Sequence, residues 1–210
     1  MLHPSGALFW TNRRMLLIAD VHLGKVSHFR KAGFAVPPEA ISKNFLQLAA
    51  VMDYFQPEYV CFLGDLFHSE LNSEWELFSE WAKDVSAQII LIVGNHDIIS
   101  PERYTDIGIE VFQELGEDGF LFTHYPTENS EYFNFAGHIH PSVKLYGYGR
   151  QFLKLACFFQ KPNQMILPAF GEFTGTYELK PTEEDVVYAL TKESVILIPK
   201  KNINSVRKER

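Results

Sequence analysis

The chain has 210 residues, of which 46% are hydrophobic and 21% charged, a composition ordinary for a soluble globular protein. Its formal net charge of −7 argues against broad affinity for nucleic acid, and its longest apolar runs have the length of strands, which excludes a transmembrane helix. The first six residues lack the basic region and apolar core of a secretory signal, so we expect a cytoplasmic protein without a membrane partner.

The first half of the chain alternates predicted strands and helices. Apolar runs predict three buried strands, at residues 15–19, 59–63 and 88–93. Pro37 and Pro38 precede apolar residues that recur with a helical period up to Phe55. A capping box that begins at Ser73 predicts a helix to about residue 85, and Ser100-Pro101 predicts the start of a short helix. This order is typical of parallel βαβ units.

The second half is predicted to consist mostly of strands. Its β-branched and aromatic runs are short and separated by turn residues, at 109–115, 119–124, 133–136, 143–148, 152–159, 165–167, 186–190 and 195–198. They favour a mostly antiparallel or mixed sheet. We therefore expect an α/β fold with two mixed sheets flanked by helices, a four-layer α/β/β/α sandwich. One domain should cover residues 1–199, and the basic tail 200–210 should be frayed.

Five motifs, each after a predicted strand, supply the donor types that a pair of metal ions needs. They are Asp20-Val21-His22, Gly64-Asp65 with His68 three residues on, Gly94-Asn95-His96-Asp97, the single His124, and Gly137-His138-Ile139-His140. Open α/β sheets place their sites at the carboxyl ends of strands, so these side chains should meet there. Each motif alone is weak, and their order and spacing make the set strong.

Two divalent cations about 3.5–4 Å apart require a bridging carboxylate, several imidazoles and neutral oxygen donors. Asp65 is the natural bridge, Asn95 offers an amide oxygen, and His124 adds a further position. The motifs Asp20-Val21-His22 and His138-Ile139-His140 each separate two donors by one residue. If these strand ends are extended, both donors of each motif point to the same side.

Two histidines have other expected roles. His96 follows Asn95 and should project to the other side of the chain, which suits an acid that reaches over the metals toward the substrate. The nucleophile would be a metal-bridging hydroxide, since coordination lowers the pKa of water. His68 has three open alternatives: it contacts the substrate, orients a metal ligand, or caps a turn.

With their residues in this order, the five motifs resemble the calcineurin-like metallophosphoesterase superfamily. The resemblance implies two divalent metal ions per chain, manganese first, with iron or zinc as alternatives. It implies one metal held by Asp20, His22, Asp65 and His140, and a second held by Asp65, Asn95, His124 and His138. It also places His96 at the position of the catalytic histidine, which protonates the leaving oxygen or stabilises transition-state charge.

A narrower resemblance covers nearly the whole chain. Its segments are Asp20–Lys25, Phe29–Gly33, Val36-Pro37, Gly64–Ser69, Gly137–Pro141 and Leu167–Gly175, which are similar to the ligase-associated DNA-damage-response phosphoesterases (PdeM family). This resemblance implies a DNA-repair role alongside a DNA ligase and a helicase. It gives no oligomeric state.

The acidic residues are distributed unevenly along the chain. No Asp or Glu lies between Asp20 and Glu39 or between Glu131 and Glu172, and both stretches flank metal motifs. Candidate phosphate contacts in them are Lys25, Arg30, Lys31, Lys144, Arg150 and Lys154, with His68 as a further substrate contact. Phe29, Tyr146, Tyr148 and Phe152 could stack bases. Packing in the core or on an edge strand is the alternative for these aromatic residues.

Three functions follow. The first is a dinuclear metal-dependent phosphodiesterase that cleaves single-stranded DNA or DNA ends. The second is a phosphodiesterase or phosphatase acting on cyclic nucleotides or nucleotide metabolites, since the same metal centre serves both. The third is a catalytically inactive scaffold that binds a partner, which the complete donor set and His96 argue against.

Overall fold

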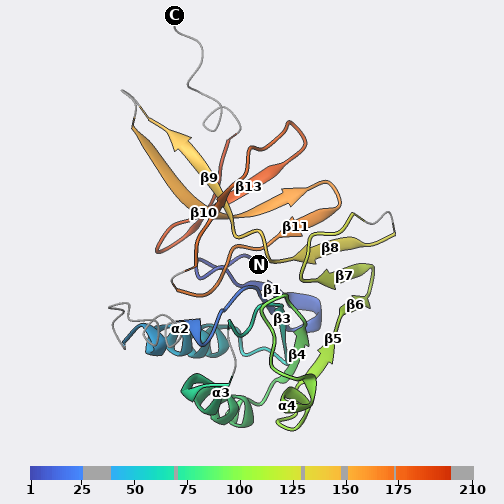
Figure 1. Ribbon diagram of the computed structural model, residues 1–210. Coiled ribbons are helices and arrows are strands. Elements are labelled where there is room, and N and C mark those ends of the chain that lie inside the picture. The colour runs from blue at the N-terminus through green and yellow to red at the C-terminus, as the bar shows by residue number, and fades with distance from the viewer. Residues whose placement is uncertain (26–38, 69–70, 129–130, 148–150, 173, 200–210) are drawn as a thin grey trace, which may run out of the picture.

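The computed structural model describes residues 1–25, 39–68, 71–128, 131–147, 151–172 and 174–199. The predicted tail and the candidate residues Phe29, Arg30, Lys31, Tyr148 and Arg150 lie outside this part of the chain. Two β-sheets pack against each other, and the helices lie on the outer side of one of them (Figure 1). Within the described residues, no helix is both long enough and apolar enough to cross a membrane.

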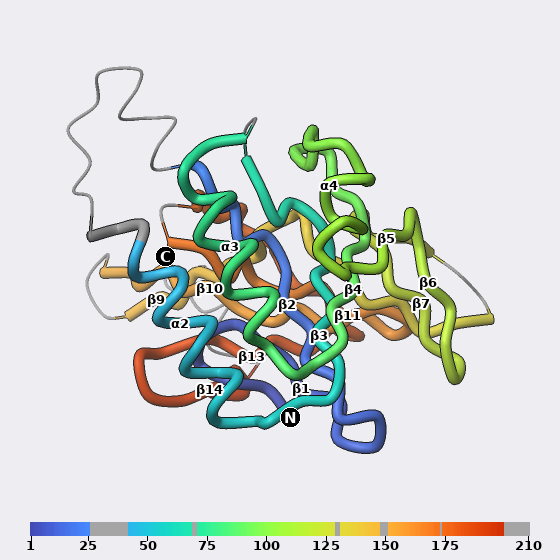
Figure 2. Tube along the Cα trace, turned by 90° about the horizontal axis from the view of Figure 1, so that it is seen from below, coloured from blue at the N-terminus to red at the C-terminus, as the bar shows by residue number. Residues whose placement is uncertain are grey.

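The first sheet has five strands in the order β1-β2-β3-β4-β5. They are β1 (Leu8–Trp10), β2 (Met15–Ile18), β3 (Tyr59–Leu63), β4 (Gln88–Ile92) and β5 (Glu110–Phe112). Strands β2 to β5 are parallel, and β1 runs antiparallel to β2 after the 3-10 helix η1 (Thr11–Arg13). Helices α2 (Glu39–Phe55), α3 (Ser73–Asp84) and α4 (Pro101–Thr105) lie on one side of this sheet (Figure 2).

The second sheet has nine strands, in the order β12-β9-β10-β11-β8-β7-β6, with β13 and β14 following on from β10. They are β6 (Glu114–Glu117), β7 (Phe120–Thr123), β8 (Phe133–Ala136), β9 (Pro141–Tyr146), β10 (Phe152–Lys161), β11 (Gln164–Ile166), β12 (Tyr177–Glu178), β13 (Val186–Leu190) and β14 (Val195–Leu197). Three of its pairings, β7–β8, β8–β11 and β9–β12, are parallel. The predicted mixed sheet is confirmed.

The inner strands of the first sheet, β2, β3 and β4, are mostly apolar because both faces are buried. Leu16 and Ile18 of β2 belong to the cluster that packs under the helices, together with Phe78 of α3. Met15 and Leu17 point the other way, into the layer between the two sheets. The alternation of side chains along β2 therefore places its residues in two different apolar clusters.

The α/β class with two packed mixed sheets is confirmed. In the described residues, all α-helices lie beside the five-stranded sheet, as Figure 1 shows. On the other face of the nine-stranded sheet lies a third apolar cluster, formed by Val143, Cys157, Phe159, Ile166, Val187, Ala189 and Ile198. Cys61 and Cys157 are both buried and free, as predicted, and lie in different clusters.

Two local predictions were wrong. The strand predicted over residues 109–115 is two strands in different sheets, because β5 pairs with β4 and β6 with β7. The chain passes from one sheet to the other between them. Helix α3 is capped by Asn72 instead of Ser73: the Asn72 side chain accepts from the backbone N–H of Glu74 at 2.8 Å. The Glu74 carboxylate is buried and accepts from the N–H of Gly24 at 2.6 Å, which ties α3 to the segment after β2.

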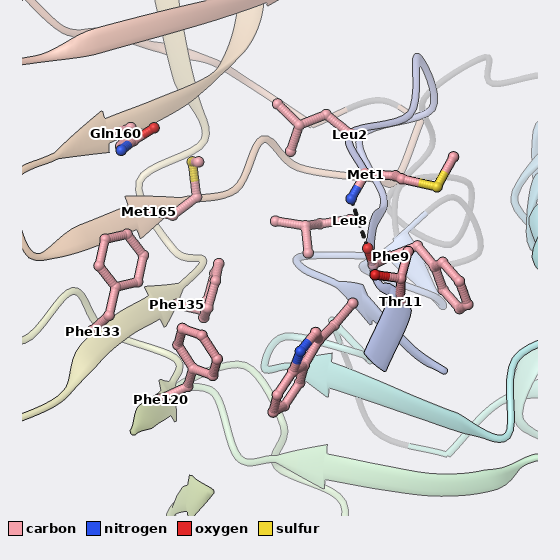
Figure 3. Close-up of a pocket in the computed structure, with 11 residues that line it drawn as sticks. Met1, Leu2, Leu8, Phe9, Thr11, Phe120, Phe133, Phe135, Gln160 and Met165 are labelled. Carbon is pink, nitrogen blue, oxygen red and sulfur yellow. Dashed lines mark hydrogen bonds between the residues drawn. The ribbon is translucent and has the colours of Figure 1, made fainter. Parts of the chain in front are cut away.

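An open apolar pocket of about 300 Å³ lies between the sheets (Figure 3). It is lined by Met1, Leu2, Leu8, Phe9, Trp10, Thr11, Phe120, Phe133, Phe135, Gln160 and Met165. Trp10 pairs with Met15 at the amino end of β2, and Phe120 and Phe133 begin β7 and β8. The pocket therefore lies at the end of the strands remote from the predicted metal motifs. None of these lining residues has an ionisable side chain.

Candidate metal centre

The five motifs meet where the carboxyl ends of strands from both sheets converge. Asp20, Asp65 and Asn95 follow β2, β3 and β4, and His124 and His138 follow β7 and β8. Backbone hydrogen bonds hold the segments together beyond the strands. The N–H of His22 donates to the carbonyl of Asp65 at 2.9 Å, and the N–H of Gly137 donates to the carbonyl of His124 at 3.1 Å.

Two triads of donor side chains result. Asp20, His22 and His140 form one and Asp65, His124 and His138 the other, and within each triad the donor atoms lie within 4.8 Å of one another. The Asp65 carboxylate faces both triads. Its Oδ2 is 3.7 Å from Nε2 of His22, and its Oδ1 is 3.4 Å from Nε2 of His124. This geometry suits a bridging carboxylate.

Asn95 completes the second group. Its Oδ1 lies 3.1 Å from Nε2 of His124, although Asn95 itself is exposed. The structure therefore brings the side chains that were predicted to bind two metals together in one cluster.

The hydrogen bonds of the imidazoles determine which nitrogen faces the site. Nδ1 of His124 donates to the carbonyl of Leu63 at 2.9 Å, and Nδ1 of His140 donates to the carbonyl of Gly175 at 3.0 Å. A carbonyl only accepts, so each Nδ1 carries the proton and each Nε2 lone pair remains for a metal. These lone pairs point toward the carboxylates, since Nε2 of His140 is 3.3 Å from Asp20 Oδ1.

Burial and neighbouring groups shift the pKa of His22, His138 and His140. Burial lowers the pKa of His22 to about 2, with neighbouring His140 as a second cause, so His22 is a neutral donor. Burial also lowers the pKa of His138. Burial acts in the same direction on His140, but its hydrogen bond to Asp20 and the charge of that carboxylate outweigh it and raise the pKa. Divalent transition metals bind the neutral form of an imidazole, so a metal at the first triad would displace the proton that Asp20 favours on His140.

Several of these residues have a left-handed backbone, with φ of 55° at Asp20, 51° at His22, 51° at Asp65, 67° at His138 and 51° at His140. This conformation is uncommon outside glycine and costs on the order of 1 kcal/mol at each position. Such strain concentrates at functional sites, where the surrounding structure enforces it. The predicted extended geometry for Asp20-Val21-His22 and His138-Ile139-His140 was therefore wrong. Asp20 and His22 still meet in the first triad, whereas His138 and His140 lie in different triads.

Glycines allow the backbone to approach these residues. A Cβ on Gly94 would lie 2.3 Å from Oδ1 of Asp65, and one on Gly171 would lie 2.0 Å from the carbonyl oxygen of Val21. The N–H of Gly171 also donates to the carbonyl of Asp20 at 3.1 Å. Gly171 thus packs closely against the backbone between two donors of the first triad.

Gly171→Ala should distort the first triad, because the added methyl meets backbone atoms that cannot rotate away. We expect a loss of about 1–3 kcal/mol in the free energy of unfolding, together with weaker metal binding. Calorimetry and metal analysis of the purified variant measure both. Gly116→Ala is the matched control, since its Cβ would meet only Tyr132, at 3.8 Å. Equal stability and equal metal binding of the two variants would refute this role of Gly171.

His96 lies beside the triads but outside them. Its N–H donates to Oδ1 of Asp65 at 2.8 Å, and its ring centre is 5.4 Å from that of His22. The ring of His68 stacks on it at 4.5 Å with an interplanar angle of 27°. Nδ1 of His68 is also 3.2 Å from Nδ1 of His22. Of the three alternatives for His68, this contact favours orientation of the His22 ring.

Of the other predicted substrate contacts, the structure describes Lys25, Lys144 and Lys154, and of these Lys25 follows a metal motif directly. Lys25 is half-buried, and burial lowers its pKa, although the charge of Asp65 acts in the opposite direction. The position of Lys25 therefore indicates a positively charged side chain next to the first triad. Arg30, Lys31 and Arg150 lie outside the described residues.

Two residues at the site were not predicted to have a role. Tyr125 is 51% exposed, and its ring centre lies 4.4 Å from that of His138 and 4.9 Å from that of His124. Its position directly after a single histidine was the available signal. Asp97 accepts from the N–H groups of Phe67 and Gly94 at 3.0 and 2.9 Å, and burial raises its pKa to about 6. It joins the loops that carry Asp65 and Asn95.

Two packed mixed sheets with a cluster of carboxylates and imidazoles at their shared strand ends define a metal-dependent phosphoesterase. The model of the family described as "Calcineurin-like phosphoesterase" matches residues 13–192. The chain belongs to this family, which uses two metal ions.

A solved structure described as Pseudomonas putida nuclease MPE is similar over most of the chain. The two share 28% identity with a TM-score of 0.77, over 94% of this chain and 93% of that one. This similarity is consistent with the narrower family resemblance of the sequence.

Two further solved structures are more distant. The E. coli phosphoesterase YfcE is 15% identical, with a TM-score of 0.47 over 90% of this chain and 99% of that one. The Aquifex aeolicus protein AQ665, of unknown function, is 16% identical, with a TM-score of 0.44 over 65% of this chain and 81% of that one. The comparison with curated proteins gave no match.

Proposed function

We propose that the protein is a two-metal phosphodiesterase that cleaves DNA, acting on single strands or strand ends. The observation that carries the reaction class is the Asp65 carboxylate, whose two oxygens face separate triads of donors. A pair of divalent cations, manganese first in our proposal, would supply Lewis-acid polarisation of the phosphoryl group and activation of water.

The described residues would have separate roles in metal binding. Asp20, His22, Asp65 and His140 would hold one metal, and Asp65, Asn95, His124 and His138 would hold the other. Leu63 and Gly175 fix the rings of His124 and His140 through their carbonyls. These contacts keep the donors in place before the substrate arrives, so little reorganisation is needed during the reaction.

His96 would transfer a proton to the leaving oxygen. Its ring is half-buried beside the first triad and is supported by stacking on His68. The hydrogen bond from its N–H to Asp65 fixes its backbone relative to the proposed bridging carboxylate. The alkoxide that leaves during DNA cleavage is strongly basic and needs a proton from such an acid. A leaving group that is already stabilised needs this proton less.

DNA is proposed as the substrate on two grounds. The similar Pseudomonas putida protein is described as a nuclease. The acid-free stretches of the sequence also flank the metal motifs, which lowers the repulsion of a polyanion at this edge of an otherwise acidic chain. A cytoplasmic role in DNA repair, with a DNA ligase and a helicase as partners, is the setting that we propose from the family resemblance.

A substrate panel tests the proposal. The manganese-loaded protein should cleave single-stranded DNA faster than duplex DNA, a cyclic nucleotide or a phosphomonoester at equal concentration and low salt. Absence of cleavage of any DNA, together with rapid turnover of the cyclic nucleotide, would replace DNA with a small-molecule substrate. Metal analysis of the same preparation shows whether two ions per chain were present.

A further inference from the structure

The hairpin of β9 and β10 extends away from the rest of the nine-stranded sheet (Figure 1). Across it, Tyr146 pairs with Phe152, and Lys144 pairs with Lys154. Residues two apart on a strand point to the same face, so both pairs share one surface. We call these four residues the hairpin face.

The aromatic residues of the hairpin face are exposed. Phe152 is 58% and Tyr146 37% exposed, so the alternative of core packing does not hold for them. Lys144 Nζ lies 3.9 Å from the ring centre of Phe152 and 5.6 Å from that of Tyr146. On the opposite face, Leu145 and Leu155 pack against the third apolar cluster. The hairpin is thus supported from behind and presents aromatic rings and ammonium groups in front.

The lysine pair is unfavourable by itself. Like charges directly opposite each other destabilise a sheet, and the sequence has no Asp or Glu between Glu131 and Glu172 to compensate. Glu178 of β12 is the acidic residue at the base of this face, where it pairs with Ser142. A polyanion placed along the hairpin face would offset the repulsion between the two lysines.

The hairpin face is continuous with the metal centre. β9 begins at Pro141, directly after His140. The carbonyl of Gly175 accepts from Nδ1 of His140 at 3.0 Å, and the carbonyl of the next residue, Thr176, accepts from Nζ of Lys154 at 2.9 Å. Lys154 is therefore fixed to the segment that positions a proposed metal ligand.

The hairpin face also points toward the side of the molecule that carries the metal motifs. Phe158, which has the same alternation as Phe152 and Lys154 along β10, points into the layer between the sheets. The hairpin face is hence on the side of the five-stranded sheet, whose strand ends carry Asp20 and Asp65.

We propose that the hairpin face binds single-stranded nucleic acid next to the metal centre. Bases stack on Phe152 and Tyr146, while Lys154 and Lys144 contact the phosphates between those bases and the metals. Stacking requires unpaired bases, so the surface selects single strands over duplex. This inference rests on the proposed function for the identity of the substrate.

Binding can be measured separately from cleavage. The probe is a fluorescent, phosphorothioate-protected oligothymidylate of about 12 nucleotides, titrated with the metal-loaded full chain. Phe152→Ala should weaken binding by about 5- to 150-fold, the range expected for the loss of one stacked base. Lys144→Ala and Lys154→Ala should each lower the slope of log affinity against log salt by about 0.7.

Leu153→Ala is the matched control, because Leu153 is 56% exposed on the same strand but on the opposite face. It should bind like the wild-type chain. Equal affinity of Phe152→Ala and wild type would overturn the inference, and so would an equal loss in Leu153→Ala. A change of oligomeric state in Phe152→Ala at unchanged DNA affinity would also overturn it, by assigning the face to contacts between copies.

The two proposals fail in different ways. If binding depends on Phe152 and an unprotected strand is not cleaved, the hairpin face stands and the nuclease activity does not. If single strands are cleaved and bound equally well by all variants, the nuclease activity stands and the hairpin face does not. Melting temperatures of the variants confirm that each is folded.

Discussion

Asp65→Ala is expected to leave the protein without bound metal and to lower its turnover by about 10³-fold or more, since metal coordination supplies several kcal/mol of transition-state stabilisation. The reason is that one carboxylate serves both triads, with its oxygens 3.7 Å from Nε2 of His22 and 3.4 Å from Nε2 of His124. Metal analysis after dialysis and turnover of a phosphodiester measure the two effects.

Asp185→Ala is the matched control for this substitution. Asp185 is also a buried carboxylate, but it accepts from the N–H and the hydroxyl of Thr182 at 2.7 and 2.9 Å, away from the triads. This variant should lose stability and keep both metals. If Asp65→Ala retained two ions per chain, the bridging role would be wrong.

His96→Ala is expected to lower turnover by roughly 10²–10⁴-fold, the usual contribution of a positioned acid, while two metals remain bound. The structure motivates this separation because His96 contributes its N–H, rather than its ring, to Asp65. The loss should be larger for DNA, whose leaving alkoxide needs a proton, than for a nitrophenyl diester with a stabilised leaving group.

His3→Ala is the control for a histidine remote from the site, where Nδ1 lies 2.8 Å from the hydroxyl of Ser5. It should keep full turnover. Loss of the metals in His96→Ala would show that His96 is a ligand. An equal loss on both substrates would leave His96 with charge stabilisation instead of proton transfer.

The sequence predicted most of the fold because the signals were long and periodic. The apolar runs before Asp20, Asp65 and Asn95 are buried on both faces, so they are recognisable without knowledge of their neighbours. Strands of two or three residues, such as β1 and β12, carry too little pattern to be recognised. They form because a neighbouring strand supplies their hydrogen bonds.

The candidate site could be predicted by residue type but not by geometry. The left-handed backbone at Asp20 and His22 depends on contacts from Asp65 and Gly171, which are distant in sequence. The role of Tyr125 likewise depends on how two separate strands place His124 and His138. Local pattern cannot report such tertiary constraints.

The origin of the donors in both sheets has a consequence for the chain as a whole. Asp20, His22, Asp65 and Asn95 follow strands of one sheet, and His124, His138 and His140 belong to the other. Its two cysteines are free, so two bound metal ions would add side-chain links between the sheets to the apolar layer that already lies between them. The free metal concentration would then enter the unfolding equilibrium by mass action, and the same ions that serve the reaction would also stabilise the contact between the two sheets.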